Sequence, residues 1–221
     1  ITPFNFPIMI PAVMMAMAVS VGNSVVWKPS EKVPSAALFF AELWKEAGLP
    51  NDVFNVVQGD KTAVDALLEH PEIAAVSFVG STQIGEYVYQ KGTSHNKRVA
   101  AFTGGKNHMV VMPDADLEAA ANAFVSAGFG SASQRCMAVS LLIPVGAETA
   151  DHLRQRIVEK IKALKVGAYN DPTADFGAVI SAQSQQSVLK AIDQCIADGA
   201  ELVVDGRDFK HPEYALSLIH I

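Results

Sequence analysis

The chain has 221 residues, of which half are apolar and 18% are charged, and its net charge at pH 7 is −6. This length allows one large domain or two small ones, and the acidic balance argues against binding to nucleic acid or to an anionic membrane. The two cysteines, Cys136 and Cys195, lie far apart and lack metal-ligand spacing. We therefore expect free thiols, no metal site and a reducing compartment.

Both ends of the sequence look cut. The chain begins at Ile1 without a basic stretch, so we expect no signal peptide here. The apolar run over 8–21 contains Pro11 and is shorter than the roughly 18 residues of a membrane span. It predicts a helix buried on all sides, with methionines as core filler. Residues 216–221 carry no turn or cap signal, and we expect a non-native tail there.

Strand-like and helix-like patterns alternate along the chain. Apolar runs predict strands at 24–27, 53–57, 73–79, 99–103, 108–112, 141–144 and 201–204. Helical patterns cover 35–47, 61–69, the surroundings of 87–91, 114–129, 149–165 with Thr149 as N-cap, and 181–197. Apolar strands that alternate with helices are typical of βαβ units, so we expect an α/β chain with a parallel sheet.

A loop of small residues over 128–133 leads into Gln134, Arg135 and Cys136. Small residues let a backbone approach a ligand closely, and a neighbouring arginine favours the reactive thiolate. The alternative is a buried free cysteine, and taken alone the cysteine favours that alternative.

Five short motifs occur in order: PFNFP at 3–7, KPSE at 28–31, FVGST at 78–82, GGKN at 104–107 and SQRC at 133–136. Their order and spacing resemble the aldehyde dehydrogenase superfamily over nearly the whole chain, which would cover less than half of a complete member. The closest likeness is to the acylating, coenzyme A-dependent branch. The resemblance implies a partial, parallel-sheet NAD-binding domain over 1–103 and the start of a second α/β catalytic domain over 104–215.

The resemblance also implies a role for each motif. Cys136 would be the nucleophile, and Asn5 with the backbone N–H of Cys136 would hold the oxyanion. Lys28 and Glu31 would bind the adenosine ribose, where an acidic residue favours NAD over NADP. The KPSE stretch also fits a simple turn in which Ser30 caps the next helix, and that interpretation is compatible with the first.

The remaining cofactor-binding residues follow from the same motifs. Gly80 and Ser81 open a helix, and N–H groups at a helix N-terminus attract phosphate. The stretch from Gly80 is not the ordinary G-x-G-x-x-G fingerprint, but the family contacts the pyrophosphate at this turn. Phe4 and Gly104 belong to the first and fourth motifs and are assigned to the cofactor by resemblance, as is Ser30.

Two positions depart from the family pattern. Phe102 stands where hydrolytic members carry a glutamate that activates water, and phenylalanine cannot accept a proton. The acylating branch also lacks the glutamate but usually has a small polar residue there, so Phe102 favours coenzyme A as co-substrate while departing from both groups. Ser133 replaces a usual glycine, which we interpret as a mild change.

The function implied is NAD-dependent oxidation of malonate or methylmalonate semialdehyde to acetyl- or propionyl-coenzyme A with loss of CO₂. Arg135 would bind the substrate carboxylate bidentately; alternatively it tunes Cys136 or pairs with an acid elsewhere. His108 is expected to be a satisfied core or surface histidine, and Cys195 to be structural.

Two other functions stay open: a hydrolytic enzyme with another base, and a fragment that is inactive alone. By resemblance, the full-length protein would be a homodimer or homotetramer. It would work in the bacterial cytoplasm or the mitochondrial matrix.

Overall fold

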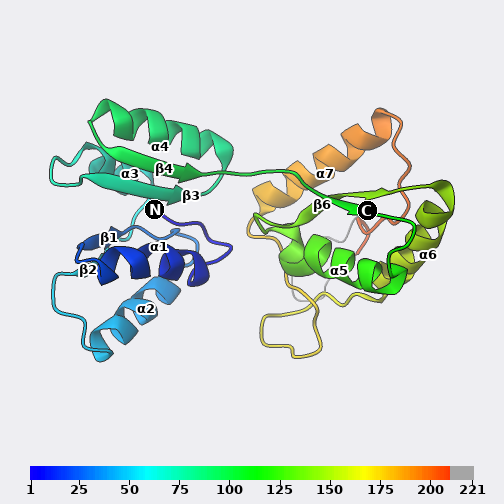
Figure 1. The fold of residues 1–221 in the computed structure, drawn as a ribbon, viewed down its shortest axis with the longest axis horizontal. Coiled ribbons are helices and arrows are strands. Elements are labelled where there is room, and N and C mark those ends of the chain that lie inside the picture. Colours follow the sequence, from blue (N-terminus) through cyan, green and yellow to red (C-terminus); the bar gives the residue numbers. More distant parts are fainter. Residues whose placement is uncertain (210–221) are drawn as a thin grey trace. The chain divides into compact units, whose positions relative to one another are not determined.

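The computed structural model describes residues 1–209, so the expected tail at 216–221 lies outside the described residues (Figure 1). The chain forms two compact units, Ile1–Gly104 and a second unit that starts at Gly105. In each unit, short parallel strands alternate with helices. The predicted α/β class is confirmed.

The first unit contains four strands and four helices. In chain order these are α1 (Met9–Ser20), β1 (Val25–Trp27), α2 (Pro34–Glu46), β2 (Phe54–Val56), α3 (Lys61–Glu69), β3 (Ala75–Val79), α4 (Thr82–Ser94) and β4 (Arg98–Phe102). Strand β1 pairs with β2, and β3 pairs with β4, both in parallel.

The first two residues of the chain join these strand pairs. The terminal amine of Ile1 donates to the carbonyl of Ser77 at 2.9 Å, and the carbonyl of Ile1 accepts from the N–H of Val79 at 3.2 Å. This offset is that of a parallel pair. On the other side, the N–H of Thr2 donates to the carbonyl of Lys28 at 3.2 Å. Residues 1–2 therefore lie between β1 and β3, and the carboxyl ends of all these strands share one edge.

Two apolar clusters support this sheet. Trp27 on β1 is buried together with Met15 and Ala37, and its indole N–H donates to the hydroxyl of Thr2 at 2.7 Å. The second cluster fills the space between β3 and the helices α3 and α4; its buried members are Val64, Leu68, Val76, Phe78 and Val88. Both clusters combine strand residues with one face of a helix, as expected for βαβ units.

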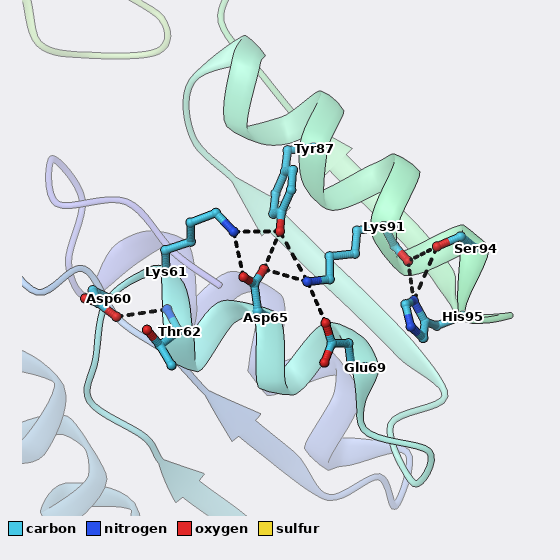
Figure 2. Close-up of polar contacts among 9 residues, drawn as sticks. All are labelled: Asp60, Lys61, Thr62, Asp65, Glu69, Tyr87, Lys91, Ser94 and His95. Atoms are coloured by element: carbon cyan, nitrogen blue, oxygen red, sulfur yellow. Dashed lines mark hydrogen bonds and ion pairs between the residues drawn. The ribbon is translucent and has the colours of Figure 1, made fainter.

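A polar network ties α3 to α4 at the surface (Figure 2). Asp65 of α3 accepts from Lys61 at 2.6 Å and from the hydroxyl of Tyr87 on α4. Lys91 of α4 lies 3.0 Å from Asp65 and 2.6 Å from Glu69. The hydrogen bonds from Lys61 and Tyr87 hold the pKa of Asp65 well below its usual range, and the bond to Glu69 raises the pKa of Lys91. The network therefore links α4 to α3 at the surface, in addition to their apolar contacts.

The expectation of a helix buried on all sides over 8–21 is wrong. Helix α1 forms there, but Pro11 and Met15 are its buried residues, while Met9, Val13 and Met17 are more than half exposed. The helix rests on β1 with one side, and no layer of the described chain covers the other, so most of its methionines are not core filler. Among the described residues, no helix is long and apolar enough to cross a membrane.

The second unit is built on one parallel pair covered by helices. Its elements are β5 (Asn107–Val111), α5 (Leu117–Phe129), the 3₁₀ turn η1 (Gly130–Ser133), β6 (Val139–Pro144), α6 (Ala147–Ala163) and α7 (Ala182–Ala197). Strand β5 pairs with β6. Buried side chains of β5, α5 and α6 form its core, among them Val111, Ala121, Leu153 and Ile161. Asp116 caps α5 by accepting from the N–H groups of Glu118 and Ala119.

Two expectations for this unit are corrected. Helix α6 begins at Ala147 with Gly146 at the N-cap; the φ of 89° at Gly146 turns the chain earlier than expected, and Thr149 is buried inside the helix instead of capping it. No strand forms at 201–204. The apolar residues there pack through Val204 against the core of α5 and α6, which explains the apolar pattern without a strand.

Candidate active site

The predicted cofactor residues gather at the carboxyl edge of the first unit's sheet. Phe4 and Asn5 follow the segment at 1–2, Lys28 follows β1 directly, Gly80 follows β3 directly, and Gly104 comes two residues after β4. In open parallel sheets, ligands bind outside the carboxyl ends of the strands. The structure thus brings these residues to the edge where a dinucleotide would bind.

Lys28 and Glu31 form a pair on this edge. The Lys28 side chain is 6% exposed, and its Nζ lies 3.3 Å from Oε2 of Glu31, whose side chain is 52% exposed. A hydrogen bond from its own backbone N–H, and then Lys28, lower the pKa of Glu31, so a carboxylate faces solvent at neutral pH. An ammonium and a carboxylate held together fit the two hydroxyls of a ribose.

Ser30 does not cap a helix, contrary to the expectation for this motif. Its hydroxyl accepts from the N–H of Lys32 at 3.3 Å, and α2 begins only at Pro34, with Val33 at the N-cap. The motif is therefore a closed turn between β1 and α2. That turn keeps Lys28 and Glu31 on the same side of the chain.

Gly80 and Ser81 form the entry to α4. A Cβ at Gly80 would lie 2.4 Å from the ring of Phe78, so only glycine fits this approach to the sheet. Ser81 occupies the N-cap without a capping side-chain bond, and the first turn of α4 contains no acidic residue. The free N–H groups of the first turn and the Ser81 hydroxyl therefore fit a phosphate group.

Cys136 lies on an exposed turn in the second unit, which excludes the buried alternative. The N–H of Ala138 donates to the carbonyl of Arg135 at 3.1 Å and closes a turn over 135–138, with Cys136 at its second position. The N–H of Cys136 donates to no backbone carbonyl among residues 1–209. This N–H is available to an oxyanion that forms next to the thiol.

Two side chains anchor this turn. The Nδ2 of Asn107, at the start of β5, donates to the carbonyl of Cys136 at 3.0 Å and to that of Ala138 at 2.9 Å. Just before the turn, Oε1 of Gln134 accepts from the N–H of Ile180 at 3.1 Å. In the sequence, Asn107 is only the last residue of the GGKN motif. Its contact with a turn 29 residues further along the chain could not be predicted from neighbouring residues.

The chain is strained immediately before the nucleophile. Ser131, Ala132 and Ser133 have φ values of 57°, 51° and 60°, three consecutive left-handed residues without a glycine. Each costs roughly 1–2 kcal/mol in this conformation. The replacement of a usual glycine by Ser133 is therefore not a mild change, because glycine adopts positive φ without that cost.

Arg135 packs against its own unit. Its Nη1 donates to the carbonyl of Ser126 in the last turn of α5 at 3.4 Å, and a Cβ at Gly130 would lie 2.6 Å from the guanidinium. The guanidinium lines a cavity of about 460 Å³ together with Lys160 and Asp175. Its contact with a helix C-terminus is favourable for a cation, and its role toward a substrate stays a prediction.

The other candidates remain outside this site. Phe102 ends β4 and is 60% exposed. His108 is exposed, and its Nδ1 lies 2.9 Å from the carbonyl of Lys106. Cys195 is an exposed thiol on α7. Within the described residues, no group of three acidic, histidine or cysteine side chains could hold a metal ion.

A parallel sheet with candidate ligand residues on its carboxyl edge, followed by an exposed cysteine on an anchored turn, defines an α/β protein with a candidate dinucleotide edge and a candidate nucleophile. The sequence model of the aldehyde dehydrogenase family matches residues 1–217, and the chain belongs to this family.

Relatives within the family agree with the motifs. A malonate-semialdehyde dehydrogenase of Pseudomonas aeruginosa is 52% identical over 210 residues, which are 95% of this chain and 42% of that protein. The acylating mitochondrial methylmalonate-semialdehyde/malonate-semialdehyde dehydrogenase of Bos taurus is 45% identical over 214 residues, which are 97% of this chain and 40% of that protein. The chain therefore spans about two fifths of the length of these relatives.

Solved structures agree as well. A crystal structure from Sinorhizobium meliloti 1021, provisionally assigned as a methylmalonate-semialdehyde dehydrogenase and complexed with NAD, matches with a TM-score of 0.94 and 54% identity over 96% of this chain and 43% of that one. The methylmalonate-semialdehyde dehydrogenase of Oceanimonas doudoroffii matches with a TM-score of 0.91 and 49% identity over 94% of this chain and 42% of that one. The expected aldehyde dehydrogenase-like fold is confirmed.

The strain at Ser133 is testable by substitution. Ser133→Gly relieves the left-handed penalty at the cost of some unfolded-state entropy, so we expect a gain of about 0.5–1 kcal/mol in the free energy of unfolding. Ser133→Val places a β-branched side chain at the same φ and is expected to lose stability. Chemical unfolding of both variants measures the difference. If the glycine variant is the less stable of the two, the left-handed conformation of Ser133 is wrong.

Proposed function

We propose that the full-length protein containing this chain oxidises malonate or methylmalonate semialdehyde with NAD and transfers the acyl group to coenzyme A. The observation that carries the proposal is the exposed Cys136 on its anchored turn, with its own N–H available, in a chain of the aldehyde dehydrogenase family. The names of the relatives support the substrate class.

The carboxyl edge of the first unit fits NAD. Lys28 and Glu31 would hold the hydroxyls of the adenosine ribose, and Gly80 with Ser81 and the first turn of α4 would hold the pyrophosphate. Phe4, Ser30 and Gly104 line the same edge by their place after the strands. When bound, NAD would supply the hydride acceptor for the substrate carbon, and the role of these residues would be to bind and orient it.

Cys136 would carry the covalent chemistry. Its thiolate would add to the aldehyde carbon, and the resulting oxyanion would accept a hydrogen bond from the Cys136 N–H and, as the resemblance to the family implies, from the amide of Asn5. A preorganised donor of this kind lowers the activation free energy by about 3–4 kcal/mol. Loss of the hydride restores the carbonyl and leaves the acyl group as a thioester on Sγ of Cys136.

Release of the acyl group would use coenzyme A. Phe102 has no group that accepts a proton, so it cannot activate water, whereas a thiolate attacks the thioester without such help. The coenzyme A thiolate adds to the acyl carbon and the Cys136 thiolate leaves. The β-carboxylate departs as CO₂, its electron pair passes to the neighbouring carbon, and a proton from water completes acetyl- or propionyl-coenzyme A.

Arg135 would distinguish these substrates from simple aldehydes. A guanidinium binds a carboxylate with two parallel hydrogen bonds. Among residues 1–209 its one hydrogen bond goes to the carbonyl of Ser126, and most of its five N–H donors remain for a second partner. Arg135 directly precedes the nucleophile, which suits a substrate whose carboxylate lies a few atoms from its aldehyde.

Glu31 sets a cofactor test. The exposed carboxylate would meet the 2′-phosphate of NADP, and like charges at short range repel. We expect a kcat/KM at least about ten-fold higher with NAD than with NADP. Glu31→Gln keeps the size and removes the charge, so the ratio should fall. Equal values for both cofactors in the unaltered enzyme would mean that Glu31 does not contact the ribose.

Coenzyme A dependence tests the function as a whole. Without coenzyme A, a stopped-flow trace with methylmalonate semialdehyde and NAD should show one NADH per site and then stop, because a missing general base costs about 10²–10⁴-fold. Addition of coenzyme A should restore turnover, and Cys136→Ala should abolish even the first NADH. Steady turnover without coenzyme A, with an acid as product, would replace the proposal by the hydrolytic alternative.

A further inference from the structure

We propose that Asn107 is a positioning residue that holds the Cys136 turn in its reactive conformation. The proposal rests on the proposed function only for the kinetic consequence, and its structural part concerns this chain alone. The geometry is a side-chain amide that bridges two carbonyls of the nucleophile turn, those of Cys136 and Ala138, at 3.0 and 2.9 Å.

Asn107 is itself held firmly. It is the first residue of β5 and pairs with Val139 of β6, with an irregularity in the register directly after it. Strand β5 continues into the core through Val111, which is buried with residues of α5 and α6. An anchor on a strand of this kind moves less than one on a loop, as a positioning residue requires.

The amide matches its two acceptors in number. An asparagine side chain has two N–H donors, and here the amide nitrogen donates to two carbonyls two residues apart. Among residues 1–209, no other side chain is recorded as donating to either carbonyl. The two bonds orient the peptide planes at 136–137 and 138–139, on either side of Met137, and so restrict the backbone directly after Cys136.

The turn needs such an anchor because packing reaches only its last residue, Ala138, which is buried. Cys136 is exposed and Met137 is 81% exposed, so core packing does not hold the two central residues of the turn. The three left-handed residues at 131–133 store strain directly before it. Strained backbone persists only where surrounding contacts over-determine it. Gln134 supplies one such contact on the near side of Cys136, and Asn107 supplies those on the far side.

The consequence for the reaction is geometric. The Cys136 N–H must point at the oxygen of the adduct while Sγ is bonded to its carbon. A displacement of about 1 Å in such a site costs up to about 100-fold in rate. We therefore expect Asn107→Ala to lower the rate of the first NADH burst by about 10- to 100-fold.

The test compares three variants of the full-length enzyme. Asn107→Ala removes both donors. Asn107→Asp keeps the shape but turns a carboxylate toward two carbonyl oxygens, so it should be at least as harmful. Asn55→Ala is the matched control, because Nδ2 of Asn55 also donates to two carbonyls, those of Asp52 at 3.0 Å and Val25 at 3.5 Å, within the first unit.

Two measurements separate positioning from general destabilisation. Amide hydrogen exchange in the peptide covering 134–140 should accelerate in both Asn107 variants and not in the Asn55 variant. The affinity for NAD, read by fluorescence titration, should stay within about two-fold in the Asn107 variants.

Each outcome decides the proposal. Faster exchange at 134–140 with a slower burst and unchanged NAD affinity supports it. Unchanged exchange, or a burst as fast as that of the unaltered enzyme, overturns it. Equal losses in the Asn55 and Asn107 variants also overturn it, because the effect would then be one of stability. If the unaltered enzyme forms no NADH from any semialdehyde, the proposed function fails, and hydrogen exchange still decides whether Asn107 holds the turn.

Discussion

The candidate cofactor edge depends on three backbone hydrogen bonds made by the first two residues. Ile1 pairs with β3 and Thr2 bonds the end of β1, so two separate strand pairs become one parallel sheet. Because parallel strands share a carboxyl edge, the residues that follow each strand meet there. Without this link, Lys28 after β1 and Gly80 after β3 would belong to two separate βαβ units with no common sheet edge.

In the second unit, an exposed residue must be held in place. A thiol that attacks a substrate must be exposed, so burial cannot fix Cys136 in place. The chain replaces core packing by hydrogen bonds from Asn107 and Gln134, and these hold a turn that follows three left-handed residues. Strain before the nucleophile and anchors around it belong together, since a strained loop without anchors would relax and carry the thiol with it.

Local patterns predicted most of the fold, and long-range contacts explain what they missed. Because apolar period and caps are local signals, the predicted bounds of α3 match the observed ones, and most other helices and strands lie within a few residues of their predicted bounds. Helix α4 begins earlier than the pattern around 87–91 indicates, and the strand predicted at 201–204 does not form. The apolar run of α1 does not show which face of the helix another element covers. The residues at 201–204 are apolar because Val204 packs against the core of the second unit, and they pair with no strand. The site residues came from motifs, whereas Asn107 and the positive φ of Ser133 depend on partners or geometry that no spacing encodes.

The short stretch at 102–107 links the end of the first unit's sheet to the residue that anchors the Cys136 turn. It begins with Phe102 at the end of β4, where a proton acceptor is absent, passes Gly104 on the cofactor edge, and ends at Asn107, which anchors the nucleophile turn. One exchange of thioesters is close to balanced in free energy, so the choice between water and coenzyme A is kinetic. A site that holds the acyl group on a well-positioned Cys136 but offers water no base favours the better nucleophile, a thiolate. In the proposed reaction, the same stretch would thus support thioester formation on Cys136 through Asn107, and would slow hydrolysis of the thioester because Phe102 offers water no base.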